Sequence, residues 1–283
     1  MNVEKKFKAL LKVDYPTDFI EGTNIPIFEP RHKEEKKRKE QEEDKYDKDF
    51  LFVDRYTGLY AFGHILLDLG GAEGLYRAIN CALLSNLNCN AKNTILDTGC
   101  GVGRMLYDCT DLFPNTFFVG MDYAYNMCRR AKDIVIDGKE ISLTEALLPR
   151  GFKKSLLVLK ETKKAKNVFI AQGSAVSLPF RDNSFDCVVN TYLIDRVDKP
   201  KLAISEMVRV LKPGGLFVLS DPLNYEKAKP QRTIPTARKL KEVIESYGVQ
   251  ITESFDGLVY REVKDIRGNY DDFLSFICIG RKH

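Results

Sequence analysis

Histidine is scarce in this chain of 283 residues, and its cysteines are poorly spaced for binding a metal. Only His32, His64 and His283 are present, so we expect no histidine metal site. The seven cysteines are an odd number, are scattered through apparent core segments and include no C-x-x-C pair. This distribution predicts reduced thiols, no bound metal and a cytoplasmic location.

The sequence also lacks a long apolar run and a strong excess of one charge. No apolar stretch approaches the roughly 20 residues that a membrane-spanning helix needs. The 44 lysines and arginines nearly balance the 40 aspartates and glutamates, which gives a net charge of +4. Nothing in this balance requires a nucleic-acid partner. We therefore expect no membrane span and no nucleic acid, and the composition leaves the oligomeric state open.

The first 92 residues fall into two parts that differ in composition, residues 1–49 and residues 50–92. Residues 1–49 contain a short amphipathic helix, a proline-containing extended arm and a charged segment over 31–48. That segment interleaves eight lysines and arginines with seven aspartates and glutamates, which favours a solvated helix or linker over a polybasic partner site. Residues 50–92 show two helical stripes, the second over 75–87. They predict either a helical cap over a cofactor cleft or padding at one edge of a sheet.

Three glycines at alternate positions mark the most informative stretch. The strand-like residues 94–98 run into Gly99, Gly101 and Gly103, and a helix follows from Arg104. A strand, a tight glycine turn and a helix N-terminus present free backbone N–H groups to a charged small molecule. The dinucleotide fingerprint G-x-G-x-x-G would need its third glycine at position 104, so Arg104 disfavours a nicotinamide-dependent oxidoreductase.

Strand and helix patterns then alternate to the end of the chain. Helices are expected over 104–113, 126–132, 202–211 and 236–247, between strands at 95–98, 116–121, 168–171, 185–190, 216–220, 249–252 and 273–279. This alternation predicts a doubly wound α/β sheet of seven strands. Ligands of such sheets bind at the carboxyl ends of the strands, where Asp97, the glycine loop and Asp122 would meet.

Residues 133–166 are too long for an ordinary connection in an α/β unit. Residues 134–136 and 139–141 flank Asp137-Gly138, a dipeptide that suits a two-residue hairpin turn. Residues 156–159 are expected to add another strand. We interpret 133–166 as an insertion near the substrate end of the sheet.

Four motifs follow one another in a familiar order: ILDTGCGVGR, VGMDYAYNM, SAVSLPFRDNSFDCVVN and EMVRVLKPGGLFVLSDP. From about residue 93 to 281 the chain resembles the class I S-adenosylmethionine (SAM)-dependent methyltransferases, in the small-molecule branch that includes the ubiquinone and menaquinone enzymes. The resemblance implies a Rossmann-like sheet and SAM as cofactor. The chain would then consist of an arm with a charged segment (1–49), a helical cap (50–92) and a SAM-binding domain (93–283).

The resemblance also assigns roles to residues of the glycine loop and of the strand ends. The backbone of the loop, from Gly99 through Cys100 and Gly101 to Gly103, would approach the amino-acid end and the ribose of SAM. Asp122 would accept hydrogen bonds from both ribose hydroxyls. Asp97 would support the loop and the methionine amino group.

Five further residues are candidate cofactor contacts. Tyr123 or Met127 would flank the adenine, and Asn190 would face the methionine portion. The family's usual Gly-Asp-Ala after the third strand is Gly-Ser-Ala here. Ser174 would therefore be a weaker adenine contact than an aspartate, or the backbone of Ala175 would take over that role.

The methyl acceptor is less defined than the cofactor. Because the methyl carbon of SAM is already activated, holding donor and acceptor in line can supply most of the catalysis. A general base matters only for some O, N or S acceptors. Residues 190–193 read Asn-Thr-Tyr-Leu and lack the Asn/Asp-Pro-Pro-Tyr motif of enzymes that methylate base or amide nitrogens, so we expect a small-molecule or peptide acceptor, methylated at O, N, S or C. Tyr192 and Asp195 are the catalytic candidates. The alternative for Asp195 is a neighbour pair with Arg196 that caps the helix starting near Lys201. The alternative function is a non-catalytic SAM-binding or interaction module that docks through residues 31–48.

Overall fold

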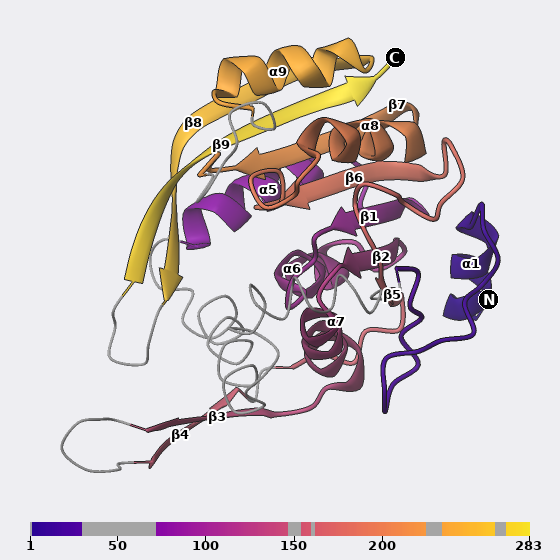
Figure 1. Ribbon diagram of the computed structural model, residues 1–283, viewed down its shortest axis with the longest axis vertical. Coiled ribbons are helices and arrows are strands. Elements are labelled where there is room, and N and C mark those ends of the chain that lie inside the picture. Colours follow the sequence, from indigo (N-terminus) through magenta and orange to yellow (C-terminus); the bar gives the residue numbers. More distant parts are fainter. Residues whose placement is uncertain (1, 30–71, 147–153, 160–161, 225–233, 264–269) are drawn as a thin grey trace.

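The computed structural model describes residues 2–29, 72–146, 154–159, 162–224, 234–263 and 270–283. They form a seven-stranded sheet of order β5-β2-β1-β6-β7-β9-β8 with helices on both faces (Figure 1). The predicted doubly wound α/β class is therefore confirmed. The charged segment 31–48 and the first predicted cap helix lie outside the described residues.

The sheet has parallel strands at its centre and an antiparallel pair at one edge. Pairing is parallel from β5 through β2, β1 and β6 to β7, whereas β9 runs antiparallel to both β7 and β8. The bounds are β1 Thr94–Thr98, β2 Phe117–Asp122, β5 Val168–Gln172, β6 Phe185–Thr191, β7 Leu211–Asp221, β8 Val249–Val263 and β9 Tyr270–Lys282. The parallel strands are buried on both faces, as continuous apolar strands require.

Two cores form because alternate side chains of each strand point to opposite faces. Ile95 joins one core, beneath α5 Ala72–Asn86, α6 Arg104–Leu112 and α7 Tyr125–Ala131. Leu96 joins the other, beneath α1 Val3–Leu10, α8 Pro200–Val210 and α9 Ala237–Ser246. The second predicted cap helix is α5, and it packs on β8, β7 and α6.

The N-terminal arm lies along the β5 edge of the sheet (Figure 1). The ring of Phe7 stacks on Phe169 of β5 at 4.1 Å between ring centroids. Ile27 forms a parallel bridge with Gln172 at the end of β5. The division of the chain at residues 49 and 92 stays a prediction, but residues 2–29 pack onto the same sheet as the rest.

The predicted hairpin around Asp137-Gly138 is wrong. Residues Lys132–Asp137 form a π-helical turn that continues α7, and Gly138 ends it with a φ of 64°. The apolar side chains that suggested a strand, Ile134 and Val135, are buried in the first core. Tertiary packing has thus overridden a local turn signal.

The hairpin of the insertion lies a few residues later in the chain. It pairs β3 Ile141–Ala146 with β4 Lys154–Leu159 and projects from the body of the molecule (Figure 1). The predicted strand at 156–159 is confirmed as part of β4.

The last two strands are longer than predicted. Because Asp221 at the end of β7 pairs with Phe276, residues 270–275 of β9 continue past the carboxyl end of β7. The β8–β9 ribbon therefore reaches beyond the sheet on the side where a ligand would bind (Figure 1).

In the described part of the chain, no helix is long and apolar enough to span a membrane. All seven cysteines lie in that part and are free thiols.

Candidate cofactor-binding site

The three glycines of the loop after β1 fall into two kinds. All three have positive φ, at 76° for Gly99, 51° for Gly101 and 87° for Gly103. A Cβ on Gly103 would lie 3.0 Å from the Val135 side chain, and one on Gly99 would lie 3.3 Å from Leu193. A Cβ on Gly101 would meet no described atom within 4 Å. Gly99 and Gly103 therefore allow close packing, whereas Gly101 faces open space that a ligand can occupy.

Asp122 ties this loop to the end of β2. One carboxylate oxygen accepts the Gly101 N–H at 2.9 Å, and the other accepts the Ala124 N–H at 2.8 Å. Burial raises the pKa of Asp122, and the backbone N–H donors limit the rise. Each carboxylate oxygen has a further lone pair, so Asp122 can hold the loop and still accept hydrogen bonds from a ligand's hydroxyls.

Asp97 lies at the end of β1, in register with Gly120 of β2 and Val189 of β6. It is 2% exposed. Burial, and secondarily the charge of Asp122, raises the pKa of Asp97 to about 8. A positive group beside Asp97 would lower that pKa, because a neighbouring opposite charge favours the ionised carboxylate. The pair of aspartates thus makes a site that suits a cation.

Asn190 joins β6 to β1 at the same edge. Its side-chain Nδ2 donates to the Thr98 carbonyl at 2.7 Å, and the Thr98 hydroxyl donates to the Val189 carbonyl at 3.0 Å. The Asn190 Oδ1 is buried and has no hydrogen-bond partner in the described part of the chain. A buried acceptor without a donor costs stability, and a ligand's ammonium group would supply the donor.

The predicted adenine contacts follow β2 and β5. The Gly173 N–H donates to the Asp122 carbonyl at 3.0 Å, which brings the two strand ends together. Ser174 Oγ accepts the Val176 N–H at 3.4 Å, and Ala175 packs against the second core. Tyr123 lies beside Asp122, and Met127 packs against the first core from α7. Their contacts with adenine stay predictions.

Aromatic side chains border the site toward the β8–β9 ribbon. Tyr192 follows β6 with a φ of 58°, a backbone conformation that is strained for a residue with a side chain. Its hydroxyl hydrogen-bonds to the Ser275 hydroxyl, and its ring packs on Tyr260 at 4.5 Å between centroids. Tyr260 in turn stacks on Phe273. Tyr192 thus faces a wall of aromatic rings beyond the carboxyl edge.

Tyr76 is a site neighbour that the sequence reasoning missed. It is buried on α5, and the Arg104 guanidinium lies over its ring at 5.1 Å. Burial, followed by the charge of Asp97, raises the pKa of Tyr76. Arg104 is itself only 9% exposed and pairs with Asp108 at 2.9 Å, so it is no surface residue. No motif marks Tyr76, because it occupies an ordinary apolar position of a helix.

Asp195 lies further along the turn after β6. Its side chain is 0% exposed, and its Oδ2 accepts the Asn224 N–H at 3.0 Å. Asp221, at the end of β7, accepts the Ile194 N–H at 2.8 Å and the Asp195 N–H at 3.3 Å. The two carboxylates therefore connect the turns after β6 and β7.

Charge couples these two aspartates. Burial, and then the charge of Asp195, raises the pKa of Asp221 to about 7. The alternative prediction is right about the neighbour pair, since Arg196 Nε lies 3.4 Å from Asp195 Oδ1, but wrong about the helix cap. α8 begins at Pro200, and no side-chain hydrogen bond caps it at Lys199 in the described structure. Asp195 Oδ2 instead accepts a backbone hydrogen bond from Asn224, in the turn after β7.

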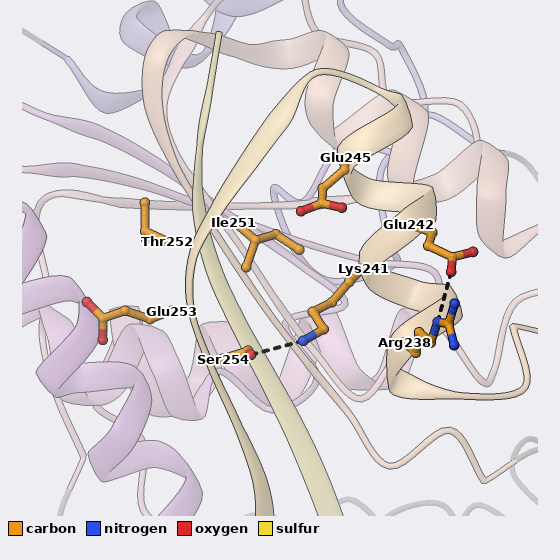
Figure 2. Close-up of a pocket in the computed structure, with 8 residues that line it drawn as sticks. All are labelled: Arg238, Lys241, Glu242, Glu245, Ile251, Thr252, Glu253 and Ser254. Atoms are coloured by element: carbon orange, nitrogen blue, oxygen red, sulfur yellow. Dashed lines mark hydrogen bonds and ion pairs between the residues drawn. The ribbon is translucent and has the colours of Figure 1, made fainter.

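A separate groove lies between α9 and β8 (Figure 2). Charged side chains line most of it, and they pair with neighbours, as Lys241 does with Ser254 at 3.3 Å and Arg238 with Glu242 at 3.3 Å. All of its lining residues come from α9 and from 251–254 of β8. The groove is therefore distinct from the carboxyl-edge site. Among the described residues, no cluster of histidine, cysteine and acidic side chains could hold a metal ion.

Comparisons with known proteins match part of this chain. The methyltransferase-domain family model matches residues 151–219. A demethylmenaquinone methyltransferase of Renibacterium salmoninarum is 39% identical over 85 residues, which cover 30% of this chain and 35% of that protein. The chain thus spans about a third of the length of the curated relatives that it matches.

Solved structures show the same fold at low identity. The YcgJ protein of Bacillus subtilis superposes with a TM-score of 0.51 at 17% identity, covering 74% of this chain and 99% of that one. The [4+2]-cyclase SpnF has a TM-score of 0.51 at 18% identity, covering 73% and 80%. The fold of this chain is therefore the fold of these solved structures. Residues 151–219 match a methyltransferase-domain model, as the motifs predicted, and the relatives similar to this chain include demethylmenaquinone methyltransferases.

Proposed function

We propose that this chain transfers a methyl group from SAM to a small-molecule acceptor. The observation that carries the proposal is the open face of Gly101, which lies beside Asp122 in a loop that follows Asp97. SAM carries an ammonium group, a sulfonium and a ribose diol. The cation site at Asp97, the acceptor of Asn190 and the carboxylate of Asp122 are the chemical partners that these groups need.

The residues of the chain would bind and orient rather than react. SAM, when bound, supplies an activated methyl carbon. Asp97 and Asn190 would hold the amino-acid end, the loop backbone would hold the ribose side, and Asp122 would fix the diol. Because the displacement needs an aligned approach, holding both reactants can supply much of the rate. The aromatic wall at Tyr192 and Tyr260 would exclude water from the acceptor side and favour a nearby cation.

We infer a flat, aromatic acceptor of the quinone type. The partly buried rings of Tyr192 and Phe273, both packed on the buried ring of Tyr260, offer faces for such a molecule. The name of the Renibacterium relative supports the same class. Asp195 would act through the turn at 221–224, because its own side chain is buried. A cytoplasmic location is part of the proposal, and the free thiols support it.

Two measurements on the full chain test the proposal. Isothermal titration with SAM and with NAD establishes the cofactor. Transfer of labelled methyl from SAM is then followed with a short-chain demethylmenaquinone kept in its reduced, hydroquinone form, which supplies the attacking electron pair and releases a proton, and with simple phenols, thiols, amines and peptides. We expect SAM binding, no NAD binding and labelled quinone product. Absence of SAM binding would overturn the proposal, whereas SAM binding without transfer to any acceptor would point to a non-catalytic SAM-binding module.

A further inference from the structure

The N-terminal arm adds a short stretch of backbone pairing to the β5 edge, at the carboxyl end of the strand. Gln172, the last residue of β5, donates its backbone N–H to the Pro26 carbonyl at 3.0 Å. Its carbonyl accepts the Phe28 N–H, also at 3.0 Å. Residues 26–28 therefore occupy the edge next to the loop that follows Asp122, since Asp122 and Gln172 are register partners.

The side chain of Gln172 connects that arm to the loop after Asp122. It is 0% exposed. Its Oε1 accepts the Glu29 N–H at 3.2 Å, and its Nε2 donates to the Tyr123 carbonyl at 3.0 Å. A single buried amide thus joins two segments that are far apart in the sequence.

The contact with Tyr123 fixes one particular peptide unit. The Tyr123 carbonyl and the Ala124 N–H belong to the same planar peptide. Gln172 binds the carbonyl of this peptide, and Asp122 Oδ1 accepts its N–H at 2.8 Å. Rotation of the peptide would break both bonds, so the Gln172 amide also holds the orientation of the Asp122 carboxylate.

We propose that Gln172 is a positioning residue that couples docking of the N-terminal arm to SAM binding at Asp122. The inference rests on the proposed function, because it takes SAM as the ligand of Asp122. A second tie supports the arm, since the Arg129 guanidinium of α7 donates to the Glu21 carbonyl at 2.9 Å. Coupling of this kind is reciprocal. SAM binding therefore protects the arm, and arm docking tightens SAM binding by the same factor.

A matched pair of variants in the full chain tests the coupling. Gln172→Met removes the buried amide with little change in volume. Asn167→Leu removes a comparable amide at the opposite end of β5, where Asn167 Nδ2 donates to the Thr116 carbonyl at 2.8 Å. SAM affinity is measured by titration, and hydrogen exchange of residues 20–29 is followed with and without SAM.

We expect Gln172→Met to weaken SAM binding about tenfold, within the usual range of coupling between sites, and to speed exchange in the arm. Asn167→Leu should change SAM affinity by less than about twofold, since it acts at the amino edge. In the wild-type chain SAM should slow exchange of the arm. Equal SAM affinity of the two variants, or an arm whose exchange ignores SAM, would overturn the proposal.

Two further outcomes, failure of SAM binding and failure of Gln172→Met to fold, are interpreted differently. If the wild-type chain does not bind SAM, the proposed function fails, and this inference fails with it even where Gln172→Met frees the arm. If Gln172→Met does not fold, Arg129→Gln replaces it, because it removes the other arm tie from a partly exposed position. Faster arm exchange together with several-fold weaker SAM binding is then expected, and faster exchange with unchanged SAM affinity would contradict the coupling.

Discussion

The buried carboxyl of Asp97 makes SAM affinity depend on pH. Its pKa of about 8 in the free protein means that the carboxyl is mostly protonated at neutral pH. A cation that binds beside it requires the ionised form. The ionised fraction then rises about 50-fold between about pH 6 and about pH 8. We expect the affinity for SAM to rise by a similar factor over this range, with a proton released on binding.

The groups that surround Asp97 set the controls for this experiment. Asp122 of β2 and Tyr76 of α5 interact with it by charge, as do the thiols of Cys100, Cys109 and Cys187. Burial raises the pKa of each of these thiols, so they stay neutral between pH 6 and 8. Asp97→Asn leaves all of these groups and the SAM amino group in place. The difference between variant and wild type therefore isolates the Asp97 carboxyl.

Stability gives a second readout of the same group. The folded-state pKa of Asp97 lies above its ordinary value, so its contribution to stability is present below about pH 4 and is lost as the pH rises toward 8. Asp97→Asn removes that loss. The difference in melting temperature between cofactor-free Asp97→Asn and the wild type should therefore increase in favour of the variant as the pH rises from about 5 to about 9.

Titration calorimetry in buffers of different ionisation heat measures both the affinity and the protons released. The account predicts a steep pH dependence for the wild type and a nearly flat one for Asp97→Asn, with weaker binding at pH 8. Parallel pH profiles for the two proteins would refute the assignment of Asp97 to the cation.

Two further variants test the other carboxylates. Asp122→Ala should weaken SAM binding by about 1.5–3 kcal/mol, because a charged hydrogen-bond acceptor is lost. The control is Asp186→Ala, which removes a carboxylate that accepts the Thr94 N–H at the amino edge of the sheet and should leave the affinity unchanged. Equal effects of the two variants would refute the assignment of Asp122 to the ribose hydroxyls. Asp195→Asn should keep turnover within about tenfold of wild type, since a buried positioning residue does not remove a proton, and a loss of about 10²–10⁴-fold would identify Asp195 as a base. Burial and the Asp195 charge raise the pKa of Asp221 above its ordinary value, and the variant relieves only the charge. Part of the stability that the wild type loses as the pH rises from about 4 to about 7 should therefore be retained, as melting at about pH 5 and about pH 8 will show.

Sequence patterns were sufficient to predict the sheet, the glycine loop and Asp122. Buried parallel strands read as short apolar runs, and a glycine loop between strand and helix has a local signature. Residues whose role depends on packing carried no such signal. Asp137-Gly138 has the chemistry of a hairpin turn, yet burial of Ile134 and Val135 made a π-helical turn more favourable.

Two parts of the site depended on contacts between distant segments. Tyr76 reaches Arg104 only because α5 packs on α6. Gln172 reaches the arm because residues 26–28 pair with the β5 edge, and Pro26 gave that stretch the character of an irregular arm. Neither proximity follows from spacing along the chain, so only the fold could reveal them.

A comparison of two glycines tests the location of the cofactor most directly. Gly101 and Gly214 both have positive φ, and a Cβ on either would meet no described atom within 4 Å. Valine should therefore strain the backbone similarly at both positions, but only position 101 lies at the carboxyl edge beside Asp122. Titration of SAM into the two folded variants should show binding lost in Gly101→Val and retained in Gly214→Val. Wild-type affinity in Gly101→Val would contradict the account.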